Sequence, residues 1–274
     1  MDTDMALEAF ADASKAGELD GAVSRERFDE AAHLKITEVE ILSDGAAARL
    51  GKPRGLYITL ESDAPLWEYS PFHAERTAAV ARELKKVCGD VFRGGVMFVG
   101  LGNRRITADS VGVLAAERVL ATRHLKRLAG LDTSRLAETT VLTPGVMAQT
   151  GLESSELTAA VCGKAAPSQV IVCDALACFE PSEMGRSIQI SSSGISPGSG
   201  VDNSRCELSE ATLGARTAAV GVPTVSRLLG ERGMLVTPKP ADRLAHQSAE
   251  LIAAAVNALL YSDLTPEEVL SLTL

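Results

Sequence analysis

The sequence predicts an α/β fold with a mostly parallel β-sheet. Segments with the pattern of β-strands alternate along the chain with segments that have helical periodicity, and this alternation is typical of parallel sheets. Two of the strand segments, 96–99 and 170–173, are apolar throughout, which indicates buried strands. The 274 residues, of which 46% are hydrophobic, allow a sizeable core. We expect a single α/β domain over residues 1–274, with 1–30 as a flexible N-terminal segment.

The first half of the chain contains two predicted strands and one long predicted helix. Residues 35–42 alternate β-branched residues with glutamates, which predicts a half-buried strand. A Gly- and Pro-containing turn at 51–55 leads to a second alternating strand at 56–60. Ser70 and Pro71 predict the start of a helix that runs to about residue 87, because serine is a favoured N-cap and proline is favoured in the first turn.

The second half of the chain continues the alternation. The predicted strands are 96–99, 139–142, 170–173, 187–190 and 217–220, and a turn is predicted at 221–223. The predicted helices are 111–119, 154–162 and 242–260. Between them lies a long loop at 191–203 that is rich in Ser and Gly, and loops of this length in a compact domain are more often functional than idle.

One carboxylate is associated with each of the two most apolar strands. Asp109 lies between the strand at 96–99 and the helix that follows, and Asp174 comes directly after the strand at 170–173. The carboxyl ends of strands line the ligand crevice of an open α/β sheet, so both aspartates are predicted at one edge of the sheet. When two carboxyl groups share a site, the pKa of one rises relative to that of the other. One can then serve as the acid and the other as the base.

Each aspartate also has a structural interpretation. For Asp109 alone, a helix cap is the more common role, because aspartate is a favoured N-cap. For Asp174 the alternative is a cap or a loop hydrogen bond. Because the same arrangement occurs twice, the catalytic and structural interpretations are about equally favoured.

Composition and charge exclude several classes of protein. The formal net charge is −9, which argues against a broad affinity for nucleic acid. The sequence starts without the basic and apolar regions of a signal peptide, and no apolar run approaches the roughly 20 residues of a membrane helix. We therefore expect a cytoplasmic protein with no nucleic-acid or membrane partner.

Cysteines and histidines give no motif for a metal or a thiol nucleophile. The five cysteines include no zinc-type Cys-x-x-Cys pair, and their odd number favours reduced thiols. Cys173 and Cys178 flank Asp174, but no histidine is placed to activate them, so Cys173 is interpreted as a small apolar strand residue. The four histidines are scattered and form no His-Glu-x-x-His motif. We expect no metal and no cofactor.

Two glycine-containing segments are candidates for binding substrate. Gly100 and Gly102 follow a strand as in a dinucleotide fingerprint, but Arg105 stands where the third glycine is needed. The segment 194–200 lacks the Gly-Lys-Ser/Thr ending of a phosphate loop. We expect backbone amides in these two segments to bind substrate or a developing oxyanion. The residues are Gly100, Gly102, Asn103, Ser193, Gly194, Gly198 and Gly200.

Several segments, in order along the chain, resemble the germination protease family of spore-forming bacteria. The most specific is the block Gly-Ile-Ser-Pro-Gly-Ser-Gly-Val at 194–201. The others are 3–8, 51–61, 98–109, 170–177, 188–190, 193, 202–203, 207–209, 212–214 and 221–224.

The resemblance implies an endopeptidase that hydrolyses small acid-soluble spore proteins in the spore core during germination. The family is regarded as an atypical aspartic-type protease with two essential aspartates, which fall on Asp109 and Asp174. It also implies a fold similar to the hydrogenase-maturation endopeptidases, with helices on both faces of the sheet. A homotetramer is implied too, and the apolar stripe of the predicted helix at 242–260 is consistent with one.

Members of this family are made as zymogens that remove an N-terminal propeptide. Almost nothing precedes Thr3 here, so we expect either a form without zymogen control or a chain that begins near the mature start. Two other functions remain open. A metal-dependent maturation-type endopeptidase would need a histidine at a matching strand end, and none is found. A non-catalytic relative that binds small acidic proteins is disfavoured by the intact Asp109 and Asp174.

Overall fold

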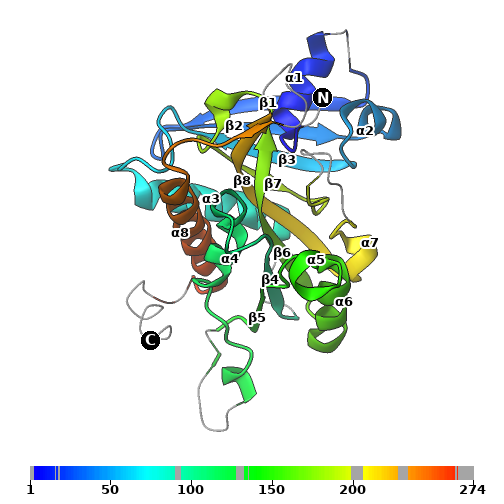
Figure 1. Cartoon of the computed structure of the whole chain (residues 1–274), viewed down its shortest axis with the longest axis vertical. Coiled ribbons are helices and arrows are strands. Elements are labelled where there is room, and N and C mark those ends of the chain that lie inside the picture. The colour runs from blue at the N-terminus through cyan, green and yellow to red at the C-terminus, as the bar shows by residue number, and fades with distance from the viewer. Residues whose placement is uncertain are drawn as a thin grey trace.

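The chain folds around one mixed β-sheet, which forms the centre of Figure 1. The computed structural model describes residues 3–15, 17, 19–89, 94–127, 133–134, 136–198, 206–227, 234–262 and 264. Within these residues the strand order is β1-β2-β3-β7-β8-β6-β4-β5, and β9 pairs with β8. The strands are β1 (Ala22–Asp29), β2 (Leu34–Ile41), β3 (Gly55–Glu61), β4 (Val96–Gly100), β5 (Thr139–Leu142), β6 (Gln169–Cys178), β7 (Ser187–Ser191), β8 (Arg216–Arg227) and β9 (Leu235–Val236).

The helices fill the connections between these strands. The α-helices are α1 (Ala6–Lys15), α2 (Asp44–Leu50), α3 (His73–Cys88), α4 (Val111–Ala116), α5 (Met147–Thr150), α6 (Ser154–Ala165), α7 (Glu210–Leu213) and α8 (Ala241–Leu260). The short 3-10 helices are η1 (Thr107–Asp109), η2 (Leu125–Arg127) and η3 (Pro181–Glu183). Among the described helices, none is long and apolar enough to span a bilayer.

The predicted α/β class is confirmed, but the sheet is mixed rather than mostly parallel. Strands β8, β6, β4 and β5 run parallel to one another, whereas β1, β2, β3 and β7 each pair antiparallel with their neighbours. The residue pattern explains the division. The parallel strands β4 and β6 are apolar and buried, while the alternating residues of β2 and β3 suit antiparallel strands with one face partly exposed.

Helices cover both faces of the sheet, as expected. On β6, Ile171 and Cys173 belong to the apolar core beneath α3, α4 and α8, whereas Val170 and Val172 pack on the opposite side with Cys162 of α6 and Leu213 of α7. Successive side chains of a strand point to opposite faces, so these are the two faces of one sheet. Figure 1 shows the two groups of helices on either side of the parallel strands.

Strand β8 corrects one prediction. A turn was predicted at 221–223, but β8 continues through these residues to Arg227. Pro223 is accommodated because Leu176 pairs with Pro223 and Ala177 with Val225, which leaves Thr224 as the extra residue of a bulge. Proline is tolerated at bulges, since a ladder hydrogen bond is already interrupted there.

The first 30 residues contain α1 and β1, and β1 was not predicted. Strand β1 is at the edge of the sheet and six of its eight residues are exposed, including Val23 and Phe28. An edge strand without a buried face has no hydrophobic alternation, so the sequence pattern could not reveal it.

Helix α8 packs inside the chain. The apolar stripe that includes Leu244, Leu251 and Leu259 belongs to the core formed with α3 and α4. This stripe therefore gives no support to the predicted oligomer.

Candidate functional site

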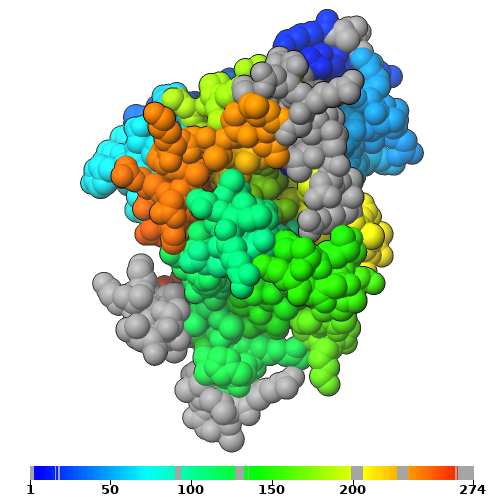
Figure 2. All heavy atoms as spheres, viewed as in Figure 1, coloured from blue at the N-terminus to red at the C-terminus, as the bar shows by residue number. Residues whose placement is uncertain are grey.

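A cavity of about 370 Å³ lies at the carboxyl end of β4, and both predicted aspartates line it. We call it the aspartate cavity and define it by Asp109, Asp174, Gly102, Gly198 and Thr224, which all contribute to its walls. Figure 2 shows one face of the molecule, on which the teal segment at about residues 101–119 lies between orange residues and the green segment of α5 and α6.

Asp174 lies within β6 rather than after its end, which corrects the predicted strand boundary at residue 173. The parallel partner β4 stops at Gly100, opposite Cys173, whereas β8 continues to pair with β6 as far as Cys178. Asp174 is therefore one residue beyond the end of β4, and the residue is 5% exposed. Its Oδ1 accepts a hydrogen bond from the backbone N–H of Ala175 at 2.9 Å.

Asp109 is the last residue of η1, in the connection between β4 and α4. Its Oδ2 accepts a hydrogen bond from the backbone N–H of Asn103 at 3.0 Å, and the same N–H lies 2.9 Å from the Asp109 carbonyl oxygen. The N-cap of α4 is Ser110, and no side chain caps this helix. The carboxylate of Asp109 therefore bonds to its own loop and does not serve as a cap for α4.

Strand β8 holds the Asp109 loop from the other side of the cavity. The hydroxyl of Thr224, the extra residue of the bulge, donates to the carbonyl oxygen of Ala108 at 2.6 Å. The carbonyl oxygen of Thr224 in turn accepts from the hydroxyl of Thr237 at 2.9 Å. The bulge thus places a hydrogen-bond donor beside the residue that precedes Asp109.

The structure distributes the other predicted site residues over several places. Gly102 and Gly198 line the aspartate cavity, and the N–H of Asn103 holds Asp109. Gly100 lines neither the aspartate cavity nor the cavity that contains Ser193 and Gly194. It permits close packing instead, because a Cβ atom there would lie 2.2 Å from the carbonyl oxygen of Gly112 in α4. Gly200 lies outside the described residues.

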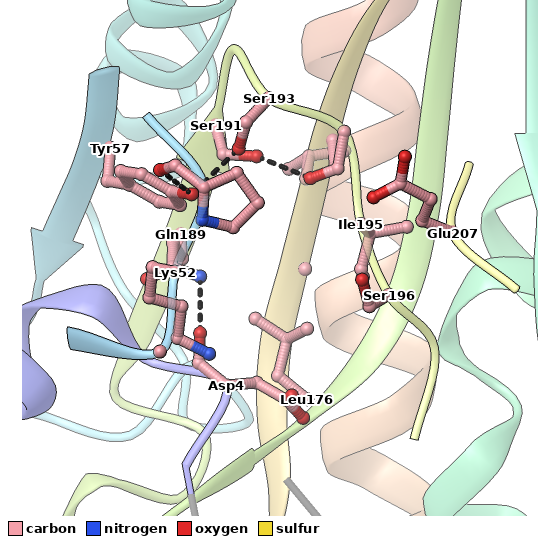
Figure 3. Close-up of a pocket in the computed structure, with 16 residues that line it drawn as sticks. Asp4, Lys52, Tyr57, Leu176, Gln189, Ser191, Ser193, Ile195, Ser196 and Glu207 are labelled. Carbon is pink, nitrogen blue, oxygen red and sulfur yellow. Dashed lines mark hydrogen bonds between the residues drawn. The ribbon is translucent and has the colours of Figure 1, made fainter. Parts of the chain in front are cut away.

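Ser193 and Gly194 line a second, smaller cavity of about 210 Å³, shown in Figure 3. We call it the Lys52 cavity, because Lys52 lines it together with Tyr57, Ser193 and Gly194. The hydroxyl of Ser193 donates to the hydroxyl of Tyr57 at 2.8 Å, which donates to the carbonyl oxygen of Pro53 at 2.8 Å. Burial raises the pKa of Tyr57 to about 12, so this phenol stays neutral and keeps its proton for hydrogen bonding.

Lys52 supplies a cation to this cavity. Its Nζ donates to the carbonyl oxygen of Thr3 at 2.7 Å. Burial lowers the pKa of Lys52, and the negative charges of Asp4 and Glu8 partly offset that effect. The Lys52 ammonium therefore lies close to the carboxylates of Asp4 and Glu8, in a partly buried wall of the Lys52 cavity.

The N-terminal segment lies between the two cavities, and Asp4 lines both of them together with Leu176. The N–H and the Oδ2 of Asp4 bond to the carbonyl oxygen and the N–H of Ala177, each at 2.8 Å. The amide of Gln189 donates to the Asp4 carbonyl oxygen at 2.9 Å and accepts from the N–H of Ala6 at 2.6 Å. These bonds fasten the segment to β6 and β7.

Asp4 and Lys52 were not predicted as site residues. Both fall in segments that carry the family resemblance, 3–8 and 51–61, and that was the available signal. Neither residue lies at the end of a predicted strand, so the predicted sheet topology did not indicate them.

The thiol alternative finds no support in the geometry. Cys173 is fully buried in the core beneath α4 and α8, on the face of the sheet opposite to Val172. Burial and the neighbouring charge of Asp174 raise the pKa of Cys173, and burial raises the pKa of Cys178 to about 12. A thiol of this kind is a poor nucleophile, because the thiolate is the reactive form.

Metal ligands do not gather in the described part of the chain. No group of three or more His, Cys, Asp or Glu residues there is arranged to hold an ion. The expectation that the protein needs no metal stays a prediction.

The comparisons with known sequences define the chain as a peptidase. The sequence profile described as Germination protease matches residues 2–231. The chain is 38% identical over 225 residues to a germination protease of Caldanaerobacter subterraneus subsp. tengcongensis, covering 81% of this chain and 68% of the relative. It is 36% identical to germination proteases of Clostridium perfringens, with 76% and 64% covered, and of Priestia megaterium, with 81% and 60% covered.

The chain belongs to the germination protease family, which is a family of endopeptidases. The matched region spans about two thirds of the length of these relatives. Among solved structures, a [NiFe] hydrogenase maturation protease HycI from Thermococcus kodakarensis KOD1 is similar at 23% identity and a TM-score of 0.37, over 61% of this chain and 97% of that chain.

Proposed function

We propose that this protein is an endopeptidase that hydrolyses small acid-soluble spore proteins inside the spore during germination, with Asp109 and Asp174 as its catalytic residues. The proposal depends on one observation above all. Two aspartates from segments far apart in the sequence line the same cavity of a chain that belongs to a family of endopeptidases.

The proposed reaction is peptide hydrolysis with water as the nucleophile. One aspartate accepts a proton from the water as general base, and the other, in its protonated form, donates a proton to the leaving amine. Gly102 lines the cavity, and its N–H donates no hydrogen bond to another described residue. We propose this N–H as the backbone donor for the oxyanion that forms on the scissile carbonyl.

The arrangement of the cavities supports a peptide substrate. The aspartate cavity and the Lys52 cavity share Asp4 and Leu176, so they adjoin along the same part of the sheet. If the scissile bond of an extended peptide lies at the two aspartates, the peptide residues next to that bond extend toward the polar walls of the Lys52 cavity.

The test is incubation with a purified small acid-soluble spore protein, followed by mass spectrometry of the products. We expect discrete internal cleavages with the wild type. Asp109→Asn and Asp174→Asn each remove a proton-transfer group, so we expect about 10²–10⁴-fold slower cleavage with unchanged circular dichroism. Asp44→Asn is the matched control, because the Asp44 side chain is 89% exposed and lies outside both cavities.

A wild type that leaves the spore protein intact would refute the substrate assignment. A folded variant at Asp109 or Asp174 that cleaves at the wild-type rate would refute the role of that aspartate. We also propose a homotetramer, on the basis of the family resemblance alone. Multi-angle light scattering that shows a monomer at micromolar concentration would contradict it.

A further inference from the structure

A third cavity, of about 310 Å³, lies between α8 and the segment that leads into α3. Helices α3 and α8 pack on the face of the sheet opposite to Val172 and α6. Gln247, Glu250 and Leu251 of α8 form one wall. These three residues lie beyond the segment 2–231 that matches the family profile, whereas the opposite wall, with Arg76, lies within that segment.

The cavity contains a buried arginine. Arg76, in the first turn of α3, lines the wall and is only 7% exposed. Its Nε donates to the carbonyl oxygen of Ala32 at 3.4 Å, which is long for an N–H···O hydrogen bond. Among the described residues, no carboxylate lies within 4.0 Å of the guanidinium, and its two Nη atoms make no hydrogen bond.

Such an arginine is unusual, because a buried charge is normally paired and hydrogen-bonded. The two Nη atoms are not among the buried polar atoms that lack a partner, so they keep some exposure to solvent, and Arg76 lines the cavity. Burial lowers the pKa of Arg76, and the charge of Asp63 offsets part of this effect. The guanidinium nevertheless keeps its charge at neutral pH.

We propose that this cavity is a binding site for a carboxylate, held by the guanidinium of Arg76. The planar guanidinium donates two parallel hydrogen bonds to a carboxylate, which suits the two unpaired Nη groups. Gln247 also lines the cavity and carries an amide that can donate a hydrogen bond, and Leu66 and Leu251 supply apolar walls for a short carbon chain.

The rim of the cavity favours a monoanion over phosphate. Glu68 and Glu250 are exposed residues of the lining, and the whole chain carries a net charge of −9. Repulsion from these charges grows with the charge of the ligand, so a dianionic phosphate is disfavoured relative to a carboxylate. The carboxylate has two possible sources, a free small acid and an acidic side chain of a peptide.

Isothermal titration of the full chain tests this proposal without any measurement of peptidase activity. The probes are N-acetylglycine for a small acid, the peptide acetyl-Gly-Glu-Gly-amide for an acidic side chain, and inorganic phosphate. We expect at least one carboxylate probe to bind more tightly than phosphate, and the tighter of the two identifies the source. Failure of both carboxylates to bind, or tighter binding of phosphate, would overturn the proposal.

Two variants locate the binding at Arg76. Arg76→Gln removes the charged hydrogen bonds, so we expect affinity to fall at least about tenfold. Arg243→Gln makes the same charge change on the exposed surface of α8 outside the cavity, and we expect affinity within about twofold of wild type. Wild-type affinity in Arg76→Gln, or an equal loss in both variants, would overturn the proposal.

Glu250→Gln keeps the test decisive if Arg76→Gln does not fold. Glu250 is exposed at the rim, so its replacement leaves the core intact and removes a repulsive charge. We expect carboxylate affinity to rise about two- to fivefold, the range typical of one exposed charge interaction. Unchanged or weaker affinity in this variant would count against the site.

Discussion

A Cβ atom on Gly102 would lie 2.0 Å from the carbonyl oxygen of Asp109. Gly102 also has a φ of +105°, in the region that favours glycine. The next residue, Asn103, donates its N–H to both the carbonyl oxygen and the carboxylate of Asp109. The segment 102–109 therefore closes on itself, and the position of the Asp109 carboxylate depends on the absence of a side chain at residue 102.

Gly102→Ala is expected to displace Asp109 and to reduce peptide cleavage about 100-fold or more, because small misplacements of a catalytic group have effects of this size. The matched control is Gly151→Ala. Gly151 also has a positive φ, +76°, but a Cβ there meets nothing within 4 Å. We expect the control to lose about 1 kcal/mol of stability through backbone strain and to keep its activity. Equal activity of the two variants would contradict the proposed dependence.

Thr224→Val tests the bond between β8 and the Asp109 loop. Valine keeps the shape of threonine but cannot donate to the carbonyl oxygen of Ala108, so we expect about tenfold slower cleavage and a loss of about 1 kcal/mol in the free energy of unfolding. Thr217→Val, on the same strand, loses a comparable bond to the Ala215 carbonyl oxygen away from the cavity. Chemical denaturation and initial rates should show similar stability losses in the two variants and a rate loss only in Thr224→Val.

The cysteines offer a test of the thiol alternative. Burial raises the pKa of Cys88 and Cys178 to about 12, and it also raises the pKa of Cys162. Because a raised pKa reduces the thiolate fraction at neutral pH, these thiols should react far more slowly than the exposed Cys206. We expect iodoacetamide at pH 7.5 to label Cys206 first, by peptide mass mapping, with cleavage unaffected.

The double variant Cys173→Ser, Cys178→Ser completes this test. Neither thiol takes part in the proposed mechanism, so the folded variant should cleave at a rate close to wild type. An inactive variant with a native circular dichroism spectrum would revive the thiol hypothesis.

Local patterns made the two central strands and their aspartates predictable. The apolar runs of β4 and β6 identified buried parallel strands, and the general geometry of such sheets placed Asp109 and Asp174 near one another. The exact end of β6 was not accessible in this way. It depends on β8, whose bulge at Thr224 allows pairing to continue past Pro223 to Cys178.

Contacts between distant segments account for what the sequence could not reveal. Asp4 reaches both cavities because Ala177 and Gln189 hold the N-terminal segment, and these bonds join residues more than 170 positions apart. No sequence pattern distinguishes Arg76 from the other polar residues of the helix predicted from Ser70 to about residue 87. Only the packing of α8 beside α3 shows that its guanidinium is buried next to a cavity.

The last prediction is that cleavage needs no bound metal. Hydrolytic metal sites usually gather three protein ligands around an open position. Asp4, Asp109 and Asp174 all line the aspartate cavity, but Asp4 and Asp109 already accept backbone hydrogen bonds from Ala177 and Asn103. Under the two-aspartate mechanism, dialysis against excess EDTA leaves the cleavage rate within about twofold of the untreated enzyme, and the rate follows the joint titration of the pair. Two carboxylates with waters also suit a hard ion such as Mg²⁺, so the assay must include metal addition. Loss of cleavage in EDTA that one divalent ion restores, with unchanged circular dichroism throughout, would replace the two-aspartate mechanism with a metal-dependent one.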